Sequence, residues 1–455
     1  MVRSDDKLRR SDQGDRRHPK RQGFVETSGH TVDFTGIRVD TSAPVGKTGT
    51  WLVDPTDLTV GTAAAATTST NLATTNVTLQ TNADGTTSGP GVTNAGPGDI
   101  NVNAPISWSS GNTLALNANH AININAPITI AGAGGLNLSA AFDPLLTSVP
   151  MLFFSLGNSV QFTGTPNIGR SLTINGQPYT LLYSIIDVQN INGSNASLSG
   201  NFALAKSLDT STLTNWMPIG TNSAGQVLNG TGFTGAFEGL GNTIANLKIS
   251  PAPGNLVGLF GISDGTIRNV GLLNETVTAA ANVTPSGIFV GGLVGMNAGT
   301  IAQSFTKGIV NGGSDSFFVG GLVGWNSGSV FQSYATSSVS GTGSVGGLIT
   351  TATVQPTQIL GSPSFPGDRS FHRADFAHAA VRTGGQLTGH RVGHAASGRR
   401  HRGDTKWRHD DARLRSAGRH RHYPNLAGDS SPSASADHHA WRRHSAARRD
   451  ALCSA

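Results

Sequence analysis

The side chains best suited to chemistry gather in the last hundred residues of the 455-residue chain. The tripeptide Arg402-Gly403-Asp404 is a candidate site, because adhesive proteins can present this sequence to integrins. It lies in a string that is rich in these same residue types, and we interpret it as a chance occurrence. Histidines of the same segment could bind a transition metal adventitiously, but they have no ordered carboxylate or Cys partner: His420, His422, His438, His439 and His444.

Two fragments of nucleotide-binding motifs occur upstream. Gly46-Lys47-Thr48 ends like a P-loop, yet Thr41 stands where the first glycine is required and no helical pattern follows. Residues 341–346 fit G-x-G-x-x-G within a glycine-rich repeat, without the strand and helix that the motif needs. The sequence therefore predicts no cofactor and no metal site.

A carbohydrate-active enzyme is the alternative from another functional class. Its chemistry needs two carboxylates, or a carboxylate and a base, converging on one groove. Residues 23–350 contain only His30 and His120. The acids of this stretch are dispersed, as at Asp33, Asp40, Asp99, Asp143, Asp187, Asp209, Glu238, Asp264, Glu275 and Asp315. We therefore expect no enzymatic activity.

Charge divides the chain into three unlike parts. Residues 1–22 hold eight Lys/Arg and four Asp, whereas residues 23–350 hold seven Lys/Arg against fourteen Asp/Glu. Residues 351–455 hold seventeen Lys/Arg against eight Asp. The basic tail could hold phosphates non-specifically by counterion release, but nothing in it predicts specific nucleic-acid recognition. The net charge of +6 thus belongs to the two ends.

Export and membrane signals are missing from the sequence. The N-terminus is charged throughout and has no apolar h-region, so it does not resemble a signal peptide. The longest apolar run, residues 149–156, is too short to span a bilayer. The single cysteine, Cys453, excludes an internal disulfide.

Two families of repeats organise the middle of the chain. GDINVNAPISW at 98–108 recurs as HAININAPITI at 120–130, an offset of 22 residues in which apolar and polar residues alternate. VGGLVGMNAGTIAQSF at 290–305 recurs as VGGLVGWNSGSVFQSY at 319–334, an offset of 29 residues. Period-2 alternation predicts half-buried strands, and a short unit of this kind can bury its apolar face only by stacking on its neighbours. The sequence therefore predicts an all-β, parallel β-helix or solenoid.

The repeats also predict the orientation of individual side chains. Leu293, Val294 and Ile301, with their counterparts Leu322, Val323 and Val330, are expected to point inward. Equivalent Asn residues could form ladders along the stack or simply face water. The glycines at 291–292 and 320–321 would permit a positive φ or a close backbone approach at a corner. Aromatic residues such as Phe305, Tyr334 and Trp325 are interpreted as packing or surface residues.

These segments together resemble filamentous-haemagglutinin-like exoproteins of the two-partner secretion route. The stretch at 23–60 is similar to the one that follows their secretion domain, and the 22-residue units resemble their haemagglutinin repeats. Residues 257–349 are similar to their GLUG repeats. The resemblance implies a right-handed β-helix exported through an outer-membrane partner pore, although the family's signal sequence and secretion domain are not found.

Five regions follow from the patterns. Residues 1–22 are a basic head and residues 351–455 an Arg/His-rich tail, both expected to be disordered. The abrupt loss of the repeat near Thr350 suggests that the tail, and part of the head, are frame-shifted translation. Between them lie haemagglutinin-type repeats at 23–145, a connecting β region at 146–230 and GLUG repeats at 231–350.

The resemblance implies a large surface adhesin that attaches to a host or bacterial glycan or protein receptor. Its location would be extracellular or on the cell surface. A second alternative is the stalk of a contact-dependent toxin-delivery exoprotein, which would share every feature of the rod. The sequence names no receptor-contact residue.

Overall fold

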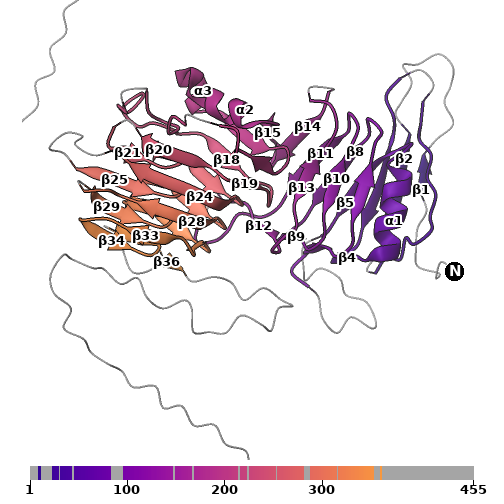
Figure 1. The fold of residues 1–455 in the computed structure, drawn as a ribbon. Coiled ribbons are helices and arrows are strands. Elements are labelled where there is room, and N and C mark those ends of the chain that lie inside the picture. Colours follow the sequence, from indigo (N-terminus) through magenta and orange to yellow (C-terminus); the bar gives the residue numbers. More distant parts are fainter. Residues whose placement is uncertain are drawn as a thin grey trace, which may run out of the picture. The chain divides into compact units, whose positions relative to one another are not determined.

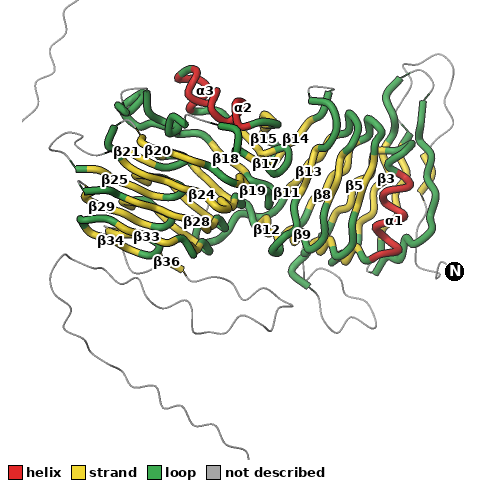
Figure 2. The backbone as a smooth tube through the Cα atoms, in the orientation of Figure 1, coloured by secondary structure: helices red, strands yellow, loops and turns green. Residues whose placement is uncertain are grey.

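The computed structural model describes residues 9–11, 23–29, 31–43, 46–82, 96–146, 149–166, 169–213, 216–222, 225–252, 254–280, 287–314, 316–352 and 359–360. All of them belong to one compact unit, residues 1–387. Strands dominate, and helices are few and short (Figure 2). The sequence-based prediction of an all-β chain with parallel sheets is confirmed.

One long sheet follows the chain through almost all of its described length (Figure 1). Neighbouring strands in this sheet are parallel, except for the antiparallel pairs β1–β2 and β14–β15. Its strands, in order, are β1 (Arg9–Ser11), β2 (Phe24–Ser28), β3 (Thr50–Asp54), β5 (Asn76–Gln80), β8 (Thr113–Asn117), β11 (Gly135–Ser139), β14 (Ser171–Ile174), β15 (Gln177–Leu182), β16 (Asn201–Leu204), β18 (Ala236–Glu238), β23 (Thr266–Arg268), β27 (Thr300–Ala302), β31 (Ser329–Phe331) and β36 (Ile359–Leu360).

Two shorter parallel sheets accompany its first half. Ile100 pairs with Ile122, and Ile106 with Ile128, so both sheets repeat at the 22-residue offset expected from the sequence. One sheet contains β4 (Leu58–Val60), β6 (Ile100–Val102), β9 (Ile122–Ile124) and β12 (Leu152–Phe154). The other contains β7 (Ile106–Trp108), β10 (Ile128–Ile130) and β13 (Val160–Phe162).

Three further sheets accompany its second half. Val294 pairs with Val323 at the 29-residue offset. The first sheet has β17 (Leu208–Asp209), β19 (Thr243–Ala245), β20 (Lys248–Ala252), β24 (Gly271–Ala279), β28 (Phe305–Asn311), β32 (Tyr334–Ala335) and β33 (Ser338–Ser340). The second has β21 (Leu256–Val257), β25 (Ile288–Gly291), β29 (Ser316–Gly320) and β34 (Ser344–Gly346). The third has β22 (Phe260–Ser263), β26 (Val294–Asn297), β30 (Val323–Asn326) and β35 (Ile349–Ala352).

Alternation along the strands builds the core. In β6, Ile100 and Val102 are fully buried while Asn101 between them is half-buried. Buried apolar residues form two clusters, one drawn mainly from residues 34–174 and the other from residues 182–349. The inward direction expected for Leu293, Val294 and Ile301 and their counterparts is confirmed, because all six are buried. Equivalent apolar side chains of successive strands therefore lie next to one another in the core.

Corners of the 29-residue repeat use glycine for close approach. A Cβ on Gly291 would lie 2.1 Å from the Val294 carbonyl oxygen, and one on Gly320 would lie 1.9 Å from that of Val323. The positive φ angles of the repeat fall elsewhere, on Gln303 (51°) and Gln332 (46°). Of the two roles that the sequence left open for these glycines, the structure therefore uses close approach.

Helices interrupt the strands where the sequence analysis expected only β structure. Helix α1 (Thr62–Asn71) lies within the predicted 22-residue repeat region, and α2 (Ile185–Gln189), η1 (Asn190–Gly193) and α3 (Asn195–Leu198) lie within the predicted connecting β region. Local chemistry explains two of them. Four consecutive alanines favour α1, and a capping box between Ser184 and Asp187 begins α2.

The prediction that both ends are disordered is wrong at three places. Arg9–Ser11 forms β1 against β2, β35 extends to Ala352, and Ile359–Leu360 forms β36 against β31. An edge strand presents unpaired N–H and C=O groups, which an extended segment can satisfy whatever its side chains. The other residues of 1–22 and 353–455 lie outside those that the structure describes.

Candidate binding surface and buried polar sites

The motifs singled out from the sequence do not form a site in the described part of the chain. Arg402-Gly403-Asp404 and the tail histidines lie outside the described residues. Gly46-Lys47-Thr48 leads into strand β3 rather than a helix, and residues 341–346 run from a turn into β34. Neither glycine motif therefore has the helix N-terminus that phosphate binding requires.

Amide ladders connect successive strands. Asn123 donates from Nδ2 to Asn101 Oδ1 over 3.0 Å, and Asn125 donates likewise to an oxygen of Asn103 over 2.9 Å. In the second repeat family, Asn297 Nδ2 donates to Asn326 Oδ1 over 2.6 Å, and both residues are fully buried. The sequence left ladders and simple exposure as alternatives, and the structure has ladders at these positions.

Aromatic side chains are also in register. The rings of Phe305 and Tyr334 are stacked, with centroids 5.1 Å apart and planes within 4°. Phe289 is the register partner of Phe318 across β25 and β29, and a bulge leaves Phe317, the residue before Phe318, without a register partner on β25. Phe317 is consequently 56% exposed, with its ring edge-on to Phe318 at 4.7 Å. Phe317 therefore leaves a large apolar ring at the surface of this repeat region.

One histidine and one aspartate are paired just before the adjacent strands β9 and β6. Asp99 Oδ1 lies 2.7 Å from His120 Nδ1 and accepts the Ala121 N–H at 3.0 Å. Asp57 accepts the N–H groups of Gly98 and Asp99. The pair fastens a turn between neighbouring repeat units, and the His120 side chain is 41% exposed.

A buried ion pair joins β18 to β23. Arg268 Nε lies 2.6 Å from Glu238 Oε2, and the two residues are register partners. Both side chains are almost completely buried, and the Leu240 N–H donates to Glu238 Oε1 at 2.8 Å. Burial raises the pKa of Glu238, while the Arg268 guanidinium opposes that shift. Arg268 Nη1 also donates to the Pro150 carbonyl oxygen at 3.4 Å, whereas Arg268 Nη2 is buried without a hydrogen-bond partner among the described residues.

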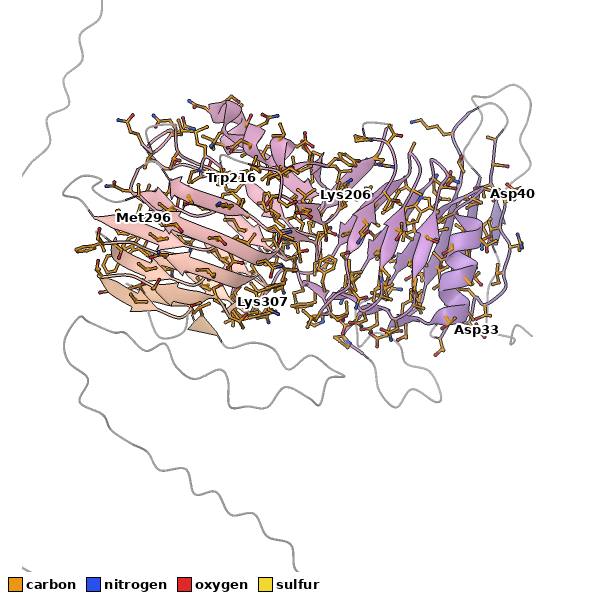
Figure 3. All side chains as sticks on the ribbon, viewed as in Figure 1. Asp33, Asp40, Lys206, Trp216, Met296 and Lys307 are labelled. Atoms are coloured by element: carbon orange, nitrogen blue, oxygen red, sulfur yellow. The ribbon has the colours of Figure 1, made fainter. Side chains whose placement is uncertain are left out.

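A second buried carboxylate, Glu275, has no cationic partner among the described residues. Its Oε1 accepts the Ser337 hydroxyl at 2.6 Å, and its Oε2 accepts the Lys307 N–H at 3.2 Å. The Lys307 side chain itself is exposed (Figure 3). Burial raises the pKa of Glu275, and the hydrogen bond from Ser337 opposes the shift.

A shallow hollow of about 360 Å³ lies beside the start of α1, between residues 32–35 and 59–64. Asp33, which is labelled in Figure 3, is the one charged residue that lines it. The pKa of Asp33 is lowered by hydrogen bonds from Thr35, so the carboxylate is ionised at neutral pH. A single carboxylate cannot supply both the acid and the base that glycoside hydrolysis needs.

Within the described ranges, His, Cys, Asp and Glu nowhere gather in threes around a point that could hold a metal ion. None of the described helices has the length and apolar character needed to cross a membrane.

Sequence reasoning missed both buried carboxylates. Glu238 and Arg268 occupy equivalent positions of successive units, AFE at 236–238 and TIR at 266–268, so an alignment of these units could have paired them. Glu275 had no such signal, because a bulge between β24 and β28 turns it inward.

Comparisons with known proteins give a partial picture. No family model matches the chain. A stretch of 133 residues, 28% of this chain, is 33% identical to Halomucin of Haloquadratum walsbyi (strain DSM 16790 / HBSQ001), and this stretch is 1% of that protein's length. A crystal structure from Bacteroides ovatus, provisionally named an immunoglobulin A1 protease, is 17% identical with a TM-score of 0.26, covering 40% of this chain and 74% of that one.

Proposed function

We propose that this chain is part of a large surface adhesin of the filamentous-haemagglutinin type. Its described strands would be the coils of a right-handed parallel β-helix, and the haemagglutinin-type and GLUG repeats would be its structural units. The protein would be extracellular or on the cell surface, having left the cell through an outer-membrane partner pore.

The observation that carries the proposal is the register of the repeats. Parallel strands pair at the 22-residue offset in the first half and the 29-residue offset in the second. Repeats stacked in this way yield an extended surface without a dominant cavity. The local match to Halomucin, of which it covers 1%, agrees with an origin in a very large protein.

Attachment through such a surface would rest on many weak contacts. Half-buried and exposed Asn, Thr and aromatic side chains repeat along the outer faces, including the stack of Phe305 on Tyr334. Several equivalent contacts bind with an avidity that exceeds any one of them. The receptor would be a glycan or a protein on a host or bacterial surface.

Bead attachment tests this function. Beads coated densely with the full chain should adhere to epithelial or bacterial cells, whereas beads coated at one tenth of that density should lose most adhesion because avidity depends on density. Glycosidase or protease treatment of the cells then separates a glycan receptor from a protein receptor. Equal adhesion of beads coated with heat-unfolded chain would refute a role for the folded surface. A density map showing a left-handed coil would refute the proposed architecture.

A further inference from the structure

Glu275 occupies an unusual place in the sheet formed by β24, β28 and β33. Leu273 pairs with Lys307 and Thr276 with Ile309, so Asn274 and Glu275 together face the single residue Gly308. Such a bulge turns one extra side chain away from its expected face. Asn274 has φ of 54° and is exposed, while Glu275 is fully buried.

Gly308 is what allows the carboxylate to enter. A Cβ on Gly308 would lie 2.2 Å from the Glu275 carbonyl oxygen and 2.6 Å from its carboxyl carbon. The Gly308 N–H donates to Ser337 Oγ at 3.2 Å, and the same hydroxyl donates to Glu275 Oε1. The carboxyl group therefore connects three successive chain passes, through residues 275, 307–308 and 337.

No basic side chain balances this carboxylate within the described residues. Lys307 on β28 and Lys248 on β20 are the charged residues of the neighbouring strands, and both side chains are exposed. The segment at 336–340 and the turns around Gly292 and Gly321 carry no titratable group. Ionised Glu275 thus relies on the Ser337 hydroxyl and on the backbone N–H groups of Lys307 and of Glu275 itself, which compensate only part of the cost of burying a charge.

We propose that Glu275 is a pH-sensitive lock, which holds β28 and β33 tightly against β24 when its carboxyl is protonated and loosens them when it is ionised. Both forms can be accommodated, because Ser337 is half-buried: its hydroxyl can accept the carboxylic acid proton and turn its own proton toward solvent. The inference is independent of the attachment function and adds local control of the repeat region.

The direction of the effect follows from linkage. The folded-state pKa of Glu275 lies above that of an unfolded chain, because burial disfavours the charged form. The folded state therefore binds more protons than the unfolded state between the two pKa values. The stability that protonated Glu275 contributes is fully present below about pH 4.3, the pKa of an exposed Glu. It is lost as the pH rises through the folded-state pKa of Glu275.

Hydrogen exchange on the full chain between pH 4 and pH 8 tests the lock. The ratio of exchange rates in the wild type and Glu275→Gln removes the intrinsic pH dependence of exchange. For peptides covering 305–311 and 334–340 the ratio should rise with pH by about tenfold for each unit of pKa shift. Peptides covering 100–130 should show a constant ratio. Asp264→Asn, which removes an exposed carboxylate, should behave as wild type throughout.

Ser337→Ala provides a second variant that retains the carboxyl. Loss of the hydroxyl donor should raise the Glu275 pKa further and move the loosening to higher pH. Identical pH dependence in wild type and Glu275→Gln would overturn the proposal. So would weaker protection of 305–311 in Glu275→Gln than in the wild type at pH 8, because the ionised carboxylate would then be the form that holds the strands.

Discussion

Replacing Arg268 with methionine while leaving Glu238 in place leaves a buried carboxylate without its cationic partner. Methionine keeps most of the volume of the arginine stem and removes the guanidinium that lies 2.6 Å from Glu238 Oε2. The Glu238 side chain is fully buried, so water cannot replace the lost partner. Breaking a buried pair in this way costs about 3–5 kcal/mol.

The double variant Glu238→Gln/Arg268→Met separates the charge from the packing. The glutamine can still accept the Leu240 N–H with its amide oxygen, and no uncompensated charge remains. Replacing both members of a buried pair is often nearly neutral. We therefore expect the double variant to recover at least about 2 kcal/mol of the loss caused by the single change.

Urea unfolding of the full chain, followed by tryptophan fluorescence, measures both variants. Trp216 is a suitable reporter because it is buried in the second cluster and donates to the Leu259 carbonyl oxygen. The exposed Arg38→Met is the matched control and should change stability by less than about 0.5 kcal/mol. Equal destabilisation by the single and double variants would refute the reasoning, because packing rather than charge would then account for the loss.

Three further variants test a close contact between a glycine and an aromatic ring, the amide ladders and the titration of Asp209. Gly271→Ala should lower stability by about 1–3 kcal/mol in thermal denaturation, because its Cβ would lie 2.2 Å from the Phe305 ring. The control Gly347→Ala should leave stability unchanged, because its Cβ would meet nothing within 4 Å. Equal effects of the two variants would contradict a specific ring contact. Asn297→Ala should lower the free energy of unfolding in urea by about 1–3 kcal/mol, because it leaves the buried Asn326 Oδ1 without its donor. Asn125→Ala, which removes an exposed hydrogen bond of the other amide ladder, should lower it by less than about 0.5 kcal/mol. Similar losses would mean that burial does not decide how much such a hydrogen bond stabilises the fold. Hydrogen bonds from Asn246 and Ser211 lower the pKa of Asp209, so this carboxylate adds stability above its unfolded pKa that is lost as pH falls through the lower folded value. Asn246→Ala should raise the Asp209 titration midpoint seen by carbon NMR, and an unchanged midpoint would exclude the Asn246 amide as the cause.

Much of the fold was accessible from periodicity. The 22-residue offset predicted which residues pair, and Ile100 lies opposite Ile122 as that offset requires. Inward and outward faces followed from alternation, because successive side chains of a strand point to opposite faces. Helix α1 was not anticipated, since an alanine-rich segment inside a region of strands carries no period-2 signal to mark its boundary.

The buried polar sites could not be predicted from periodicity, because their burial depends on how the strands pair. Alternation assigns a residue to a face, but a bulge shifts every later residue to the other face. Glu275 is buried because one residue of β28 faces two of β24, and this count is set where the strands pair. Composition alone gave a dispersed set of acids with no indication of which would be enclosed.

By itself, the sequence determined the all-β class, the two repeat lengths and the direction of the apolar side chains, because these depend on spacing along one strand. Only the tertiary structure decided which polar groups meet. The ion pair of Glu238 with Arg268 and the hydrogen bond of Ser337 to Glu275 join residues 30 and 62 positions apart. Their distances depend on the stacking of separate chain passes and on a local bulge, and neither is encoded in the pattern of any single strand.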